Sequence, residues 1–175
     1  MQISLVLIVM GSDRPGIVES IAGQVAAVGA NWEESRMARL AGKFAGLLRI
    51  GVDDAKAVDL EARLSSLAAG GLTVVVERSD ETPAPPRHAL RLELVGNDRP
   101  GIVRDVSRVL ADQHINIEEL ETEVARAPMS GELLFRASAR LHAPSTVTLD
   151  ALRRQLEALA GELMVDLELD RNDEA

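Results

Sequence analysis

The chain of 175 residues contains one segment twice. Residues 11–18 read Gly-Ser-Asp-Arg-Pro-Gly-Ile-Val and residues 96–103 read Gly-Asn-Asp-Arg-Pro-Gly-Ile-Val, a displacement of 85 positions. Three further matches share this displacement: Asn31 with Asn116, Glu33-Glu34 with Glu118-Glu119, and Gly46 with Gly131. Matches in one register without a gap indicate a duplicated domain, because a solenoid needs at least about three shorter repeats. The chain is therefore predicted to form two small domains with one modest core each.

Composition limits what two such domains can do. Aromatic residues make up 2% of the chain, so the cores are predicted to be aliphatic and base-stacking platforms are absent. The net charge is −9 and both halves are acidic, which argues against direct binding of nucleic acid. There is no cysteine, which excludes disulfides, thiolate metal sites and cysteine nucleophiles and is consistent with a reducing compartment.

The apolar residues 1–10 resemble the hydrophobic part of a signal peptide, but they have no positive flank and lead directly into the repeated segment. Their counterpart, residues 89–95, lies in mid-chain, so a first strand is the better interpretation. No stretch is long enough to span a membrane. We expect a cytoplasmic protein without membrane association.

The order of elements is predicted to be the same in both halves. Strands are expected over 3–10, 32–40, 44–52 and 72–77, and again over 90–95, 115–124, 132–141 and 163–169. Helices are expected after the first and third strand of each half. The first helix of each half should have its proline, Pro15 or Pro100, at the first helical position, and Gly29 should end the helix in the first half.

This βαββαβ order predicts an α+β fold, with two ferredoxin-like domains in tandem. In each, two helices cover one face of a four-stranded antiparallel sheet. The polar, proline-rich segment between the halves indicates a semi-rigid spacer. We predict a first domain over 1–80, a linker over 81–87, a second domain over 88–170 and a flexible tail over 171–175.

The repeated Asp-Arg-Pro-Gly segments lie between the first strand and the first helix of each half. Amides at a helix N-terminus attract anions, so those of Gly16 and Ile17, and of Gly101 and Ile102, can receive a carboxylate. Asp13 and Asp98 can pair with an ammonium group. In the alternative interpretation, the aspartate caps the helix and the proline starts it.

Asn31 and Asn116 begin the second strand of each half. Each asparagine is expected to lie near the Asp-Arg-Pro-Gly loop of its own half, or else to satisfy only the backbone of a turn. Together, the loop and the asparagine offer groups for the carboxylate and the ammonium group of a free amino acid.

The architecture, the Asp-Arg-Pro-Gly-Ile-Val loops and the two asparagines resemble tandem ACT domains, which are amino-acid-sensing regulatory modules. The resemblance implies that an effector lies between ACT units and is contacted by the loop and the asparagine. The corresponding residues are Asp13, Arg14, Gly16, Ile17 and Asn31, and Asp98, Arg99, Gly101, Ile102 and Asn116. Some serine-binding ACT domains have Asn before Arg-Pro-Gly and His two residues earlier. This chain has Asp and Gly there, so the ligand need not be serine.

Residues 29–38, Gly-Ala-Asn-Trp-Glu-Glu-Ser-Arg-Met-Ala, further resemble the glycine cleavage repressors. This implies a non-catalytic regulator that binds a small amino acid, with glycine the first candidate, and acts on a protein partner, either a transcription factor or a metabolic enzyme. A homodimer is among the expected assemblies. One alternative is an interaction or oligomerisation module without a ligand. Another is a stand-alone relative of the ACT part of formyltetrahydrofolate deformylase or phosphoserine phosphatase.

We expect neither a cofactor nor a metal. The three histidines, His88, His114 and His142, lack metal-ligand spacing. The pairs Glu33-Glu34 and Glu118-Glu119 are expected to point to opposite faces of their strands, which argues against a paired acid and base.

Overall fold

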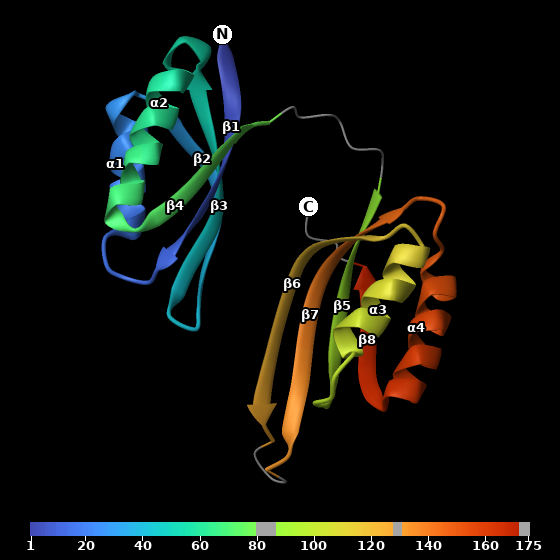
Figure 1. Ribbon diagram of the computed structural model, residues 1–175. Coiled ribbons are helices and arrows are strands. Elements are labelled where there is room, and N and C mark those ends of the chain that lie inside the picture. Colours follow the sequence, from blue (N-terminus) through green and yellow to red (C-terminus); the bar gives the residue numbers. More distant parts are fainter. Residues whose placement is uncertain (80–86, 128–130, 172–175) are drawn as a thin grey trace. The chain divides into compact units, whose positions relative to one another are not determined.

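The computed structural model describes residues 1–79, 87–127 and 131–171. The chain divides into two compact units, Met1–Thr82 and Pro83–Ala175. Each is described by itself (Figure 1). Most of the predicted linker and all but the first residue of the predicted tail lie outside the described residues, and β5 already begins at Arg87.

Both units have the predicted order of elements. The first contains β1 (Gln2–Ser12), α1 (Ile17–Ala27), β2 (Asn31–Leu40), β3 (Lys43–Asp53), α2 (Asp54–Ser66), the 3-10 turn η1 (Leu67–Gly70) and β4 (Leu72–Arg78). The second contains β5 (Arg87–Asn97), α3 (Ile102–Asp112), β6 (Asn116–Arg126), β7 (Leu133–Pro144), α4 (Leu149–Leu163) and β8 (Val165–Arg171). The sheets have the orders β2-β3-β1-β4 and β6-β7-β5-β8. All paired neighbours are antiparallel, which confirms the α+β ferredoxin-like fold.

Each unit has its own, mainly aliphatic core between the helices and one face of the sheet. Alternate residues of the central strand, Leu5, Leu7 and Val9 in β1, are completely buried because successive strand residues point to opposite faces. The apolar stripe of α1 packs onto this face, and α2 adds Leu60 and Leu64. The second unit repeats the pattern with the alternate leucines of β5 and the apolar sides of α3 and α4. Both helices of a unit therefore lie on one face of its sheet (Figure 1).

The strand register corrects one of the repeat matches. Gly11 pairs with Phe44, and its counterpart Gly96 pairs with Phe135, so the third strands are related by a displacement of 91 instead of 85. Six extra residues therefore lie at the hairpin between β6 and β7. The match of Gly46 with Gly131 was wrong, because Gly46 lies inside β3 whereas Gly131 precedes β7.

The prediction that proline occupies the first helical position was also wrong. Gly16, with φ 87°, is the N-cap of α1, and Gly101, with φ 101°, is the N-cap of α3. These left-handed conformations strongly favour glycine and place each proline in the turn before the helix. Among the described residues, no helix is long and apolar enough to cross a membrane.

The first helices of the two units end in the same way with different residues. Gly29 follows α1 with φ 68°, whereas His114 follows α3 with φ 56°. A side chain with a Cβ atom is disfavoured in this conformation. We expect His114→Gly to stabilise the second unit by about 0.5–1 kcal/mol, and Gly29→Ala to destabilise the first. Urea unfolding followed by circular dichroism tests both. A loss of stability in His114→Gly would contradict the strain argument.

Candidate functional site

The loop between β1 and α1 and the loop between β5 and α3 have the same backbone design. In each, glycine is the N-cap and no side chain caps the helix. The interpretation of Asp13 and Asp98 as helix caps was therefore wrong. The first backbone N–H groups of each helix have no intrahelical acceptor. Together with the positive end of the helix dipole, they can bind an anion at the helix N-terminus.

The arginine of each loop has a structural role. Nη2 of Arg14 donates to the carbonyl oxygen of Gly70 at 3.0 Å, and Nη2 of Arg99 donates to that of Glu162 at 3.3 Å. Both carbonyls lie at the C-terminal end of the second helical segment of the unit, where a guanidinium also meets the negative end of the helix dipole. The arginine thus ties the loop to the other helix, which explains its presence in both halves without a ligand.

The two loop aspartates differ in their side-chain contacts. The Asp13 carboxylate forms an ion pair with Arg39, with Oδ2 and Nε 2.6 Å apart. The Asp98 carboxylate has no ion pair within the described part of the chain, because Val124 stands where the first unit has Arg39. Both backbone amides bond to the neighbouring hairpin, Asp13 to Gly42 and Asp98 to Leu133. The carboxylate of Asp98 is therefore more available than that of Asp13 to bind an ammonium group.

The asparagines do not lie beside the loops of their own units, which corrects the expectation that they converge. Asn31 pairs with Gly51, and Gly51 pairs with Ser4 near the start of β1. The Asp13 loop follows Ser12, eight residues further along β1, so loop and asparagine are about 27 Å apart. Helix α1 carries the chain back along the sheet, so β2 starts at the end where β1 starts. Asn116 is placed equivalently in β6, opposite His142.

Next to each asparagine lies a cluster of ionic residues that the sequence did not reveal. A β-bulge in β2 places Glu33 and Glu34 on the same arginine, Arg49, with N–O distances of 3.4 and 3.6 Å. Two consecutive residues at a bulge oppose one residue of the partner strand, so their side chains no longer alternate. The expectation that the glutamates point to opposite faces was therefore wrong.

The second unit repeats the cluster. A bulge in β6 places Glu118 and Glu119 on Arg140, at 3.5 and 2.8 Å. His142 adds a fourth group, with Nδ1 3.3 Å from Glu118. The matching position in β3 is Gly51, where a Cβ atom would collide with the Glu33 carboxylate. Only the second cluster therefore contains a histidine.

Comparison with protein families agrees with this architecture. Residues 4–77 match one model described as an ACT domain, and residues 90–161 match a second model with the same description. Each match covers one of the two units.

The chain belongs to the family of tandem ACT-domain proteins.

Three relatives extend over almost the whole ACT pair. The glycine cleavage system transcriptional repressor of Escherichia coli (strain K12) is 28% identical over 163 residues, which are 91% of this chain and 85% of that protein. An unknown protein from Galdieria sulphuraria has a similar structure, with a TM-score of 0.89, 33% identity and coverage of 98% and 99% of the two chains. The structure of a putative glycine cleavage system transcriptional repressor has a TM-score of 0.70 at 21% identity and 98% coverage of both chains, and supports the fold.

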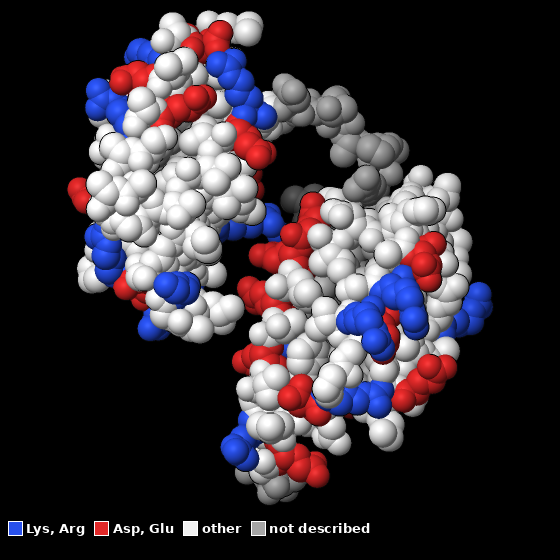
Figure 2. Space-filling view, viewed as in Figure 1, with Lys and Arg blue, Asp and Glu red and all other residues white. Residues whose placement is uncertain are grey.

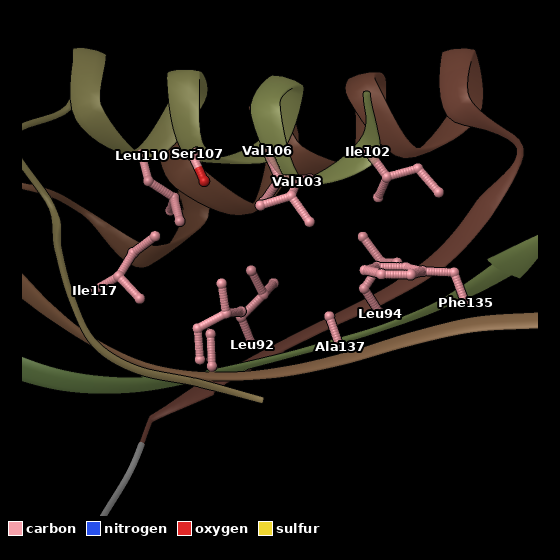
Figure 3. A pocket seen from close by; sticks show the side chains of 12 residues that line it. Leu92, Leu94, Ile102, Val103, Val106, Ser107, Leu110, Ile117, Phe135 and Ala137 are labelled. Carbon is pink, nitrogen blue, oxygen red and sulfur yellow. The ribbon is translucent and has the colours of Figure 1, made fainter. Parts of the chain in front are cut away.

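The second ACT unit contains an apolar groove of about 30 Å³ between α3 and the sheet (Figure 3). Side chains of α3, among them Ile102 and Val106, lie above Leu92, Phe135 and Ala137 of the strands. Ser107 is the one hydroxyl-bearing residue of the lining. In the first unit, Trp32 and Leu48 occupy the positions of Ile117 and Ala139 and pack on the core. The groove has room for a small apolar group, but it has no charged group to hold a zwitterion.

The helix N-terminus of the second ACT unit also has a charged neighbour. The Asp105 carboxylate forms an ion pair with Arg104, with Oδ1 and Nε 2.9 Å apart. The hydrogen bond from Arg104 lowers the pKa of Asp105. The carboxylate also lies close to Gly101, since an added Cβ there would be 3.6 Å from Oδ2 of Asp105. The first unit has Ser20 at this position, but it has Glu19 where the second unit has Arg104, so each helix has one acidic side chain in its first turn.

Proposed function

We propose that this protein is a non-catalytic regulator that binds a small amino acid, with glycine the first candidate, and acts on a protein partner in amino-acid metabolism or its transcription. The observation that carries the proposal is the pair of uncapped helix N-termini, each preceded by a glycine with positive φ, in a tandem ACT protein. The similarity to a glycine cleavage repressor supports a regulatory role. A cytoplasmic location fits a protein of this kind.

Because the loop and the asparagine of one unit lie far apart, they cannot contact the same small ligand. A ligand that contacts both must lie between two ACT units, with the loop of one and the asparagine of the other. β2 and β6 are edge strands with unpaired backbone groups, and antiparallel pairing at such an edge brings the start of one strand to the end of the other. The second unit can come from the same chain or from another copy.

In this arrangement, the loop supplies amides and a carboxylate, and the asparagine supplies an amide side chain. The proposed site consists of Asp13, Arg14, Gly16, Ile17 and Asn31, and of Asp98, Arg99, Gly101, Ile102 and Asn116. The amides of Gly16 and Ile17, or those of Gly101 and Ile102 in the second unit, receive the carboxylate of the amino acid. Asp98 is better placed than Asp13 to pair with the ammonium group, because Asp13 already binds Arg39. The two arginines hold their loops in place.

Thermal unfolding of the full chain against a panel of amino acids tests the proposal. The panel contains glycine, serine, alanine, valine and leucine, and calorimetry gives the dissociation constant of any ligand. At ten times its dissociation constant, a ligand adds about 1.4 kcal/mol of stability. Asn31→Ala and Asn116→Ala should weaken this gain in stability. Gln155→Ala, at an exposed position of α4 outside the proposed site, should leave it unchanged.

Two outcomes contradict parts of the proposal. If no amino acid stabilises the protein, it functions as an ACT interaction module without a ligand. If leucine or valine binds and glycine does not, the sensing role remains and the glycine assignment fails. In that case, the apolar groove of the second unit is the first place to look for the side chain of the ligand.

A further inference from the structure

The second unit contains a pocket of about 240 Å³ between the start of β5, the end of β8 and the connection from β7 to α4. Half of the described residues that line it are apolar, and the other half have polar or basic side chains. The apolar residues are Leu90, Ala143, Val147 and Leu149, and the others are His88, Ser145, Thr148 and Arg171. None of these is acidic, and Asp150, the acidic residue in the first turn of α4, is not part of the lining.

This pocket is separate from the proposed amino-acid site. Asp98 follows the end of β5, whereas His88 lies at its start, about 33 Å away along the strand. Asn116 begins β6 at the same end of the sheet as the pocket and pairs with His142. The next residue of β7, Ala143, is buried in the core, so His142 and Asn116 lie on the other face of the sheet.

The start of the second helix differs between the two units. In the first unit, α2 follows β3 directly, and the carboxylate of its N-cap, Asp53, accepts a hydrogen bond from the backbone N–H of Ala55. In the second unit, residues 145–148 separate β7 from α4, and the side chain of the N-cap, Thr148, does not cap the helix. Pro144 stands at the position of Asp53 in the register. The second unit therefore has no carboxylate at this position, and its longer connection leaves room for the pocket.

The two basic side chains of the pocket also differ from their counterparts. Arg171 corresponds to Arg78 in the register, and Arg78 forms an ion pair with Asp54 at 3.1 Å. Within the described part of the chain, the guanidinium of Arg171 has neither an ion pair nor a hydrogen bond. His88 corresponds to Ile3, which packs on the core. Two basic side chains thus stand where the first unit has a neutralised arginine and an aliphatic residue.

We propose that this pocket binds a small organic anion, which consists of a phosphate or carboxylate group on an apolar body. A guanidinium can form two parallel hydrogen bonds with an oxyanion, and an imidazole donates a further one in either charge state. The hydroxyl groups of Ser145 and Thr148 can donate to the remaining oxygen atoms. The uncapped start of α4 strengthens the attraction that the two basic side chains provide.

The volume of the pocket sets the size of the ligand. A cavity of about 150 Å³ holds one benzene molecule, and drug-sized ligands occupy about 300–1,000 Å³. A pocket of 240 Å³ therefore fits an anion of about ten non-hydrogen atoms, with its apolar part against Leu90, Val147 and Leu149. For a ligand of this size we expect a dissociation constant on the order of 1 mM.

Calorimetry of the full chain with three probes tests the proposal. Phenyl phosphate and benzoate combine an anionic group with a ring, whereas phenol has the ring alone. At least one of the two anions should bind with a dissociation constant of about 1 mM, and phenol should bind at least about tenfold more weakly. The anion that binds more tightly identifies the group that the pocket prefers.

Two variants locate the charge that binds the anion. Arg171→Gln should raise the dissociation constant of the anion at least about tenfold, because charge-assisted hydrogen bonds are lost. Arg108→Gln removes the same charge from an exposed position of α3, where salt screens its effect, and should change the dissociation constant less than about twofold. Circular dichroism verifies that both variants fold. Unchanged binding in Arg171→Gln, equal binding of phenol, or no binding of either anion up to about 10 mM overturns the proposal.

The histidine rings give a second, independent readout, because the chain has only three histidines. In proton nuclear magnetic resonance spectra, the anion should shift the ring resonance of His88, which is identified by its absence in His88→Gln. The resonances of His114 and His142 should stay in place. A shift of either of these two without a shift of His88 contradicts binding in this pocket.

Discussion

Replacing Leu156 by alanine is expected to remove about 2–5 kcal/mol from the free energy of unfolding of the second unit. Leu156 lies in α4, is completely buried and packs in the core of that unit. The loss combines the transfer free energy of the removed methyl groups with the cavity that remains. Because each unit has its own core, the stability of the first unit should not change.

The single tryptophan of the chain makes this prediction easy to check. Trp32 packs on the core of the first unit, so its fluorescence follows the unfolding of that unit, whereas circular dichroism follows both. In urea, Leu156→Ala should move part of the dichroism transition to lower concentration and leave the fluorescence transition in place. Leu60→Ala, in the core of the first unit, should move the fluorescence transition. A fluorescence transition that shifts equally in both variants would show that the two units unfold together.

Gly96→Ala should destabilise the second unit by about 1–3 kcal/mol, the usual cost of excess volume in a packed site. A Cβ atom at Gly96 would come within 2.8 Å of Cβ and 3.0 Å of Cα of Val165. The Cα atom belongs to the backbone of β8, so relief requires movement of a strand. Gly11, at the equivalent position, would place a Cβ atom 3.0 Å from the carbonyl oxygen of Gly71. Gly11→Ala should therefore destabilise the first unit.

Gly161→Ala is the matched control for these glycines. Gly161 lies inside α4, and apart from the backbone of its own helix and its chain neighbours an added Cβ atom would meet nothing within 4 Å. Alanine is a better helix former than glycine, so the free energy of unfolding of this variant should be about 0.5–1 kcal/mol higher than that of the wild type. Urea unfolding followed by circular dichroism measures all three variants. If Gly96→Ala is as stable as the wild type, the close approach of β5 and β8 does not explain why glycine occupies position 96.

The fold was predictable because each half has a strong internal pattern. The helical stripe that contains Ile17, Ile21 and Val25 and the alternation in β1 define the elements, and the repeat defines their order. The hairpin between β6 and β7 was not predictable from the same displacement. Its extra residues shift every later match, and this shift concealed the equivalence of Arg49 and Arg140. A search for repeats that allows a gap would have found this pair.

The candidate site was only partly predictable. The repeated loops identified the helix N-termini, but the sequence did not show that Arg14 and Arg99 bind carbonyl groups of the same unit. The placement of Asn31 near Asp13 failed because β1 and β2 run in the same direction, so their starts lie at one end of the sheet. The ionic clusters depend on β-bulges, which leave no periodic signal in the sequence.

The side of the second sheet that its helices leave uncovered has a consequence for binding. Acidic side chains gather there along β6 (Figure 2). A partner with a basic surface would be attracted to this side mainly by charge, so its rate of association would fall as the ionic strength rises.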